Sequence, residues 1–106
     1  MVKEKTVGDL KQLIDTKQDF TLIDVREPFE KEIADIGGAL CPVGKIDAYI
    51  AQIPKDRLVV VYCRSGVRSA RAIKHLMNQY GYSNIFNLKG GILTWADEID
   101  SSIEKY

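Results

Sequence analysis

One short segment gathers side chains that could do chemistry on a cysteine. Cys63 directly follows an unbroken apolar run, Leu58–Tyr62, and the next six residues supply two arginines, two serines and a glycine. Backbone N–H groups in a tight loop can converge on an anion, and glycine permits the backbone angles that such a loop needs. A cysteine that only packs in the hydrophobic core does not need such polar and charged neighbours. The segment therefore predicts that negatively charged forms of Cys63 are stabilised.

The expected surroundings favour the thiolate of Cys63 as a nucleophile. The residues that follow have helical character, so the positive end of a helix adds to the loop N–H groups. In comparable settings the pKa of a cysteine falls from ~8.5 to roughly 3.5–7.5. A thiolate that attacks thiosulfate, or the persulfide anion that results, suits this cradle. We predict that Cys63 is catalytic and that the anion is bound by Arg64, Ser65, Gly66, Val67, Arg68 and Ser69.

Other chemistries find less support in the residue types. His75 is the only histidine and lies seven residues after Arg68, which is roughly 10 Å along a helix, so a base paired to Cys63 is not expected. The two cysteines lack metal-ligand spacing, so we expect neither a metal nor an organic cofactor. Cys41 stands in an apolar stretch before Pro42. We expect it to be buried, with a resolving role toward Cys63 as the alternative.

The rest of the chain alternates between helical and extended patterns. Apolar spacing predicts helices over residues 7–15, 27–33, 46–53 and about 70–79, with a last helix opened by Gly90 and Gly91. Short strands are expected over residues 20–25, after the turn at 36–38, and over 58–62 and 83–88. This alternation predicts an α/β fold with one mostly parallel sheet between two layers of helices. Ligands of such sheets bind beyond the carboxyl ends of the strands, where Cys63 is expected.

Length and charge narrow the class of protein. The 106 residues are expected to form one domain spanning residues 1–106. Fifteen basic and fifteen acidic residues cancel, so no overall field attracts nucleic acid or an anionic membrane. No apolar run reaches the ~20 residues of a membrane span, and no signal-peptide pattern follows Met1. A cytoplasmic location is the default expectation.

Three segments in order resemble the rhodanese-homology domain, a single-domain sulfurtransferase. They are residues 22–28 (LIDVREP), 59–69 (VVVYCRSGVRS) and 87–95 (NLKGGILTW). The resemblance implies a rhodanese-like fold: a central, mainly parallel five-stranded sheet flanked by helices on both faces. It also implies a persulfide on Cys63 held by the loop that follows. The segments around residues 36–42 and 90–100 are similar to rhodanese domains fused to molybdopterin- or thiamin-type activating enzymes, so a separate activating enzyme is one expected partner.

The length of the loop separates related activities. Four residues lie between Cys63 and Arg68, as in the sulfurtransferases that the chain resembles. The related dual-specificity phosphatases and arsenate reductases have a wider loop, with one more residue before the arginine. Phosphatase or arsenate reductase chemistry is therefore the less favoured alternative. Asp35 stands where many members have a histidine. Asp24 and Arg26, at the end of an expected strand, are interpreted as an ion pair that supports the loops, with contact to the donor as the lesser alternative.

The leading hypothesis is an enzyme of the thiosulfate:cyanide sulfurtransferase class. Cys63 would take a sulfane sulfur, the outer sulfur of thiosulfate or of a protein persulfide, and pass it to a thiophilic acceptor. The partners would be a small-molecule or protein sulfur donor and a sulfur-accepting protein, without nucleic acid or membrane. The alternative is an interaction module that relays sulfur for a separate activating enzyme and turns over small donors poorly.

Overall fold

The computed structural model describes residues 1–106 and contains one sheet of five parallel strands in the order β1-β5-β4-β2-β3. The strands are β1 (Glu4–Lys5), β2 (Phe20–Asp24), β3 (Ala39–Leu40), β4 (Leu58–Tyr62) and β5 (Ile85–Leu88). Between them run the helices α1 (Val7–Asp15), α2 (Pro28–Ile33), α3 (Val67–Tyr80) and α4 (Gly91–Glu98), together with η1 (Val43–Gln52), which is built of 3₁₀ turns. The expected α/β fold with a parallel sheet is confirmed.

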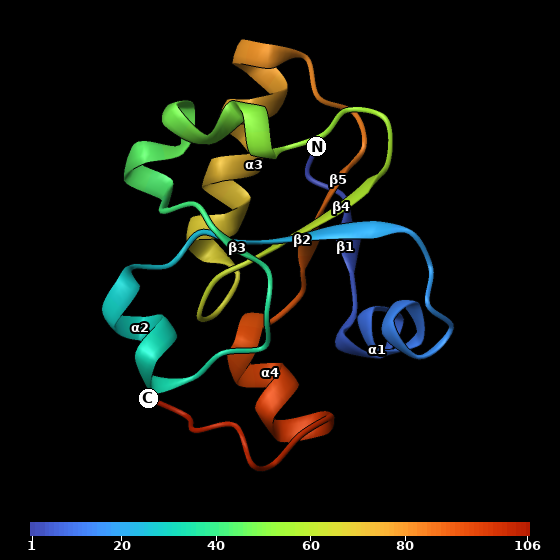
Figure 1. The fold of residues 1–106 in the computed structure, drawn as a ribbon, viewed down its shortest axis with the longest axis vertical. Helices are drawn as coiled ribbons and strands as arrows, with labels where there is room; N and C mark the ends of the chain where they lie inside the picture. Colours follow the sequence, from blue (N-terminus) through green and yellow to red (C-terminus); the bar gives the residue numbers. More distant parts are fainter.

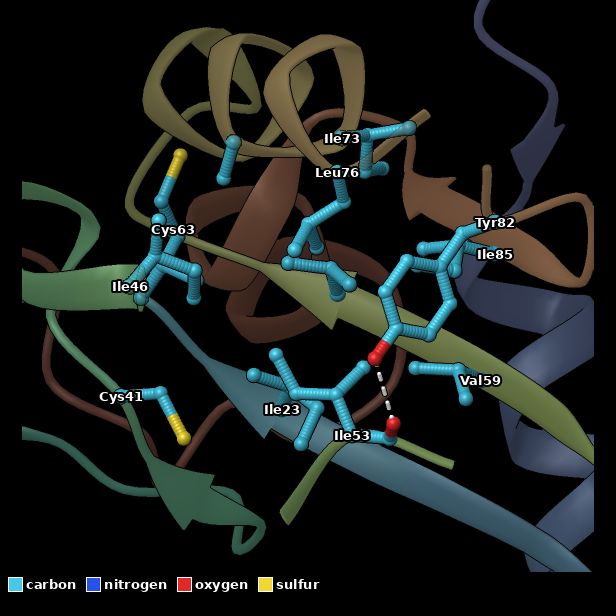
Figure 2. Close-up of a cluster of buried hydrophobic side chains, with 13 residues drawn as sticks. Ile23, Cys41, Ile46, Ile53, Val59, Cys63, Ile73, Leu76, Tyr82 and Ile85 are labelled. Atoms are coloured by element: carbon cyan, nitrogen blue, oxygen red, sulfur yellow. Dashed lines mark hydrogen bonds between the residues drawn. The ribbon is translucent and has the colours of Figure 1, made fainter. Parts of the chain in front are cut away.

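Helices cover both faces of the sheet, and each face has its own apolar cluster. In Figure 1, α3 and η1 lie on one side of the sheet, and α1 and α4 lie on the other. Successive side chains of a strand point to opposite faces, so Val59 and Val61 pack with α3 and η1, while Val60 and Tyr62 pack with α1 and α4. Figure 2 shows the first of these clusters. The unbroken apolar run of β4 is thus explained by a central strand buried on both faces.

Local sequence signals set the bounds of the helices. Thr6 and Asp9 form a reciprocal capping box at the start of α1, with both hydrogen bonds present. Pro28 occupies the first position of α2, where its missing N–H is not needed. Gly81 ends α3 in the left-handed conformation, at φ 71°. These signals are local in the sequence, which is why the bounds of α1 and α2 and the end of α3 were predictable.

Two elements differ from expectation. β1 was not predicted, because two residues are too few to show a strand pattern and both are polar. The helix expected over residues 46–53 is the 3₁₀ segment η1, which begins earlier and bends at Lys45, where φ is −126°. Ile46 of η1 and Ile53, which follows η1, are nevertheless buried in the core. No helix of the chain is long and apolar enough to cross a membrane.

Candidate active site

Cys63 lies at the carboxyl end of β4, where the chain turns into α3. Its side chain is buried, with 1% of the residue exposed, and Figure 2 shows its sulfur pointing toward the start of α3. The backbone N–H of Gly66 donates to the sulfur at 3.1 Å and that of Ser69 at 3.4 Å. The Ser69 hydroxyl oxygen is also 3.4 Å from the sulfur. Gly66, at φ 104°, adopts the left-handed backbone that brings its N–H to the sulfur.

These contacts act on the ionisation of Cys63 in opposite directions. Burial raises the pKa of the thiol, because it disfavours the charged form. The Ser69 side chain and the N–H groups of Ser69, Gly66 and Ser65 lower the pKa by stabilising the thiolate. The hydrogen bonds prevail, and the pKa of Cys63 lies below its ordinary value. The loop can therefore hold negative charge on sulfur without a cationic side chain in contact.

The start of α4, the helix that follows β5, supports the loop that holds Cys63. The N–H of Ile92 donates to the carbonyl of Cys63 at 3.0 Å, and that of Leu93 donates to the carbonyl of Arg64 at 3.2 Å. These two carbonyls point away from the sulfur, which leaves the following N–H groups free to face it. Gly91, at φ 63°, allows this close approach, since a Cβ there would lie 2.4 Å from the Arg64 oxygen.

Both loop arginines are engaged by partners other than the sulfur. Arg68 makes a bidentate pair with Glu30 of α2, with two N–O distances of 2.7 Å. Arg64 donates to the main-chain oxygen of Tyr106, at 2.6 Å from Nε. The Tyr106 hydroxyl in turn donates to Glu30 at 2.8 Å. The guanidinium groups of Arg64 and Arg68 are thus held by protein partners, and Arg68 acts on Cys63 through its charge.

The Glu30–Arg68 pair predicts an acid-sensitive contribution to stability. The hydrogen bonds from Arg68 lower the pKa of Glu30 from 4.5 to about 2 although burial opposes this. A lowered folded-state pKa stabilises the protein above pH 4.5, and this stabilisation is lost as the pH falls toward 2. Between pH 6 and pH 3, the free energy of unfolding in urea should therefore fall more for the native chain than for Glu30→Gln.

A matched control for this comparison is Glu32→Gln, at an exposed position of the same helix. It should follow the native chain across the same pH range. Parallel curves for the native chain and Glu30→Gln would show that the pair adds nothing to stability.

Asp24 and Arg26 form the expected ion pair behind the loop, and both are fully buried. Arg26 donates to the two carboxylate oxygens of Asp24, at 2.9 Å each, and to the carbonyl of Ala34 at 2.8 Å. Tyr62 donates to Asp24 at 3.1 Å. The pair therefore joins β2, β4 and the segment after α2.

Cys41 is buried as expected, whereas His75 and Asp35 have partners that the sequence did not indicate. Burial raises the pKa of the Cys41 thiol to about 11, and in Figure 2 the Cys41 sulfur points away from Cys63. His75 pairs with Asp47 of η1 at 2.6 Å and has no contact with Cys63. Asp35, in place of the frequent histidine, accepts hydrogen bonds from Lys31 and from the N–H of Gly37.

The structure adds residues that were not assigned to the site. Asn87 of β5 contacts the loop, and Glu30 and Tyr106 hold its arginines. A hollow of about 540 Å³ also opens beside the loop, lined in part by Ser65, Gly66, Arg71, Lys74 and Asn87. The only sequence signal for Asn87 was its place in one of the three segments that carry the resemblance.

Comparisons with known proteins agree with this geometry. Residues 6–98 match the rhodanese-like domain family. The chain is 44% identical over 97 residues to a sulfurtransferase of Allochromatium vinosum, which covers 91% of this chain and 90% of the relative. It is 38% identical over 104 residues to the "probable adenylyltransferase/sulfurtransferase MoeZ" of Mycobacterium tuberculosis, covering 95% of this chain but 26% of MoeZ. A rhodanese-related protein of Thermoplasma volcanium has a crystal structure with a TM-score of 0.79 and 32% identity, covering 92% of this chain and 93% of the other.

Proposed function

The chain belongs to the rhodanese-like domain family, and on this basis we propose that it transfers sulfur through a persulfide on Cys63. A sulfur-transfer role is supported by relatives that are named sulfurtransferases. The observation that carries the assignment to Cys63 is the pair of backbone N–H donors that reach its sulfur, from Gly66 and Ser69. A persulfide keeps its negative charge on sulfur, so the same donors serve both the thiolate and the loaded form.

The proposed reaction has two displacement steps. The Cys63 thiolate attacks the outer sulfur of thiosulfate, a new S–S bond forms, and the bond to the sulfite group breaks with its electron pair. The products are a Cys63 persulfide anion and sulfite. A thiophilic acceptor such as cyanide then attacks the outer sulfur, which leaves as thiocyanate and returns the Cys63 thiolate. No net oxidation or reduction of the protein is required over the cycle.

The burial of Cys63 favours donors with a protruding sulfur. Only 1% of the residue is exposed, so a donor has to bring its reacting atom into the loop ahead of the rest of the molecule. Thiosulfate and a protein persulfide both carry their sulfane sulfur as a terminal atom. Both therefore suit a buried cysteine better than a donor whose sulfur lies inside a bulky group.

Incubation with excess thiosulfate tests the proposal. The native chain and Cys41→Ser should each gain the mass of one sulfur atom, and a reductant should remove it. Cys63→Ser should gain nothing, because it lacks the attacking thiolate. Intact-mass spectrometry measures all three. A gain on Cys63→Ser would contradict the assignment and transfer it to Cys41.

A relay function is the second candidate, and the match to MoeZ favours it. This chain spans 26% of that protein, whose name combines two activities. In a relay, Cys63 takes sulfur from a protein persulfide and holds it for a separate enzyme, with little turnover of thiosulfate. The same mass measurement, with a persulfidated cysteine desulfurase as donor, distinguishes the two functions: loading only from the protein donor supports the relay.

A further inference from the structure

Asn87 is a buried polar residue in the middle of the sheet, next to the loop. It is 5% exposed and lies on β5 between β4 and β1, paired with Val61 and Glu4. Its side-chain N–H₂ donates to the carbonyl of Gly66 at 3.0 Å. Its side-chain oxygen accepts the Ser69 hydroxyl at 2.5 Å. The amide thus bridges two residues of the loop that holds Cys63.

The Gly66 carbonyl fixes the orientation of this amide. A carbonyl only accepts hydrogen bonds, so the amide nitrogen must face Gly66 and the amide oxygen must face Ser69. The Ser69 hydroxyl has a single proton, and that proton is directed at Asn87. Toward Cys63, 3.4 Å away, the hydroxyl therefore presents lone pairs. In this orientation the hydroxyl can accept the S–H of a thiol, and it stabilises a thiolate only after its proton turns from Asn87 to the sulfur.

We propose that Asn87 competes with the Cys63 thiolate for the Ser69 hydroxyl proton and thereby sets how readily Cys63 ionises. In the resting state the Ser69 proton is on the Asn87 side, and Ser69 accepts from the Cys63 thiol. When Cys63 loses its proton to solvent, the Ser69 hydroxyl turns to donate to the sulfur and gives up its bond to Asn87. Asn87 is a positioning residue in this scheme, because it acts on sulfur only through Ser69.

Removing the amide should leave the loop itself in place. The Gly66 carbonyl also accepts the N–H of Ala70, at 3.2 Å, in the first turn of α3. The N–H groups of Gly66 and Ser69 that reach the sulfur belong to the backbone and remain. Without Asn87, the buried Ser69 hydroxyl has only the Cys63 sulfur as a partner, and a buried donor left unpaired is costly. Freeing the Ser69 hydroxyl proton should therefore change the ionisation of Cys63 more than losing the hydrogen bond from Asn87 to Gly66 does.

The other charged and titratable groups around Cys63 are unchanged by this substitution. Arg68 of α3 acts on Cys63 through its charge and is paired with Glu30 of α2. Cys41 and Tyr82 are the other titratable residues buried in the same apolar cluster. β5 and the start of α4 face the loop with the neutral residues Asn87 and Gly91. A shift in the ionisation of Cys63 can thus be traced to Ser69 and Asn87.

The test is the pH dependence of alkylation of Cys63 by iodoacetamide, in a Cys41→Ser background. Asn87→Leu keeps the branching at Cγ but has no acceptor. It should lower the apparent pKa of Cys63 by about one unit, the size expected from one hydrogen bond gained by a charged group. In a chain that also carries Ser69→Ala, the same substitution should produce no such fall. Asn87→Ala removes the same amide without adding bulk and serves as the second variant if Leu is not accommodated.

The matched control is Asn84→Leu. Asn84 precedes β5, and its side chain donates to the carbonyls of Pro54 and Arg57, away from Cys63. The pKa of Cys63 should not change in this variant. The inference is overturned if Asn87→Leu and Asn87→Ala raise or preserve the pKa of Cys63, or if the shift is equal with and without Ser69. The inference relies on the proposed function only for the role of Cys63 as nucleophile. Alkylation needs no sulfur transfer, so failure to load thiosulfate sulfur would count against the function alone.

Discussion

Arg26→Met should lower the free energy of unfolding by about 3–5 kcal/mol, the range for removing one partner of a buried ion pair. The guanidinium satisfies both oxygens of Asp24, and Asp24 is fully buried. Methionine fills much of the space, but it leaves this carboxylate with only two donors. These are the Tyr62 hydroxyl and the backbone N–H of residue 26. An uncompensated buried charge is far more costly than the lost pair itself. Urea unfolding followed by circular dichroism measures the effect.

Two further variants identify the cause of that loss. Arg57→Met removes an exposed pair with Asp19, at 3.4 Å, and should cost less than about 1 kcal/mol. The double variant Asp24→Leu/Arg26→Met removes both charges and should recover a large part of the lost stability. If the double variant is as unstable as Arg26→Met, the packing of the arginine stem is responsible and the charge argument is wrong.

Gly91→Ala should destabilise the fold by at least about 3 kcal/mol and abolish sulfur loading at Cys63 in the chain that remains folded. The new Cβ would lie 2.4 Å from the Arg64 oxygen and 2.6 Å from the Cys63 oxygen. These are backbone atoms, so they cannot rotate away as a side chain would. The loop has to shift, and the N–H groups behind those carbonyls shift with it. Thermal unfolding and intact mass after thiosulfate treatment measure the two effects.

Gly81→Ala is the matched control for this collision. Gly81 has a similar left-handed backbone, at φ 71°, but a Cβ there meets nothing within 4 Å. The substitution should carry only the conformational cost of about 1–2 kcal/mol and leave sulfur loading unchanged. Equal destabilisation in the two variants would show that conformation alone, and not the contact with the loop, makes Gly91 necessary.

The sequence predicted the position of the site better than the contacts between its residues. The apolar run of β4, the loop after it and the stop at Gly81 are local patterns, so Cys63 could be placed at the end of a central strand. The partners of the loop arginines could not be predicted. Arg68 pairs with Glu30, 38 positions away, and Arg64 reaches Tyr106, 42 positions away. Only the fold brings these residues together. The sequence alone does not show which of the many distant groups a charged side chain will contact.

Asn87 and β1 were missed for a related reason. A polar residue in a four-residue strand reads as a surface position, but Asn87 is buried because its side chain packs against the loop after β4 and bonds to Gly66 and Ser69. These partners lie 18 or more positions away in the chain, so only the fold brings them to Asn87. β1 is too short to predict. The Asp24–Arg26 pair was predictable, since its two members are separated by a single residue at a strand end.

The support that α4 gives to the loop also has a consequence for the order in which the protein is made. Cys63 leaves the ribosome before Ile92 and Leu93, whose N–H groups later bind the carbonyls of Cys63 and Arg64. Until β5 and α4 have docked, the loop lacks that support, so we expect the N–H groups of Gly66 and Ser69 to be held less firmly against the sulfur. The thiol should therefore reach its full nucleophilic character only after β5 and α4 have docked. A cell would in this way be spared a reactive sulfur on unfinished chains.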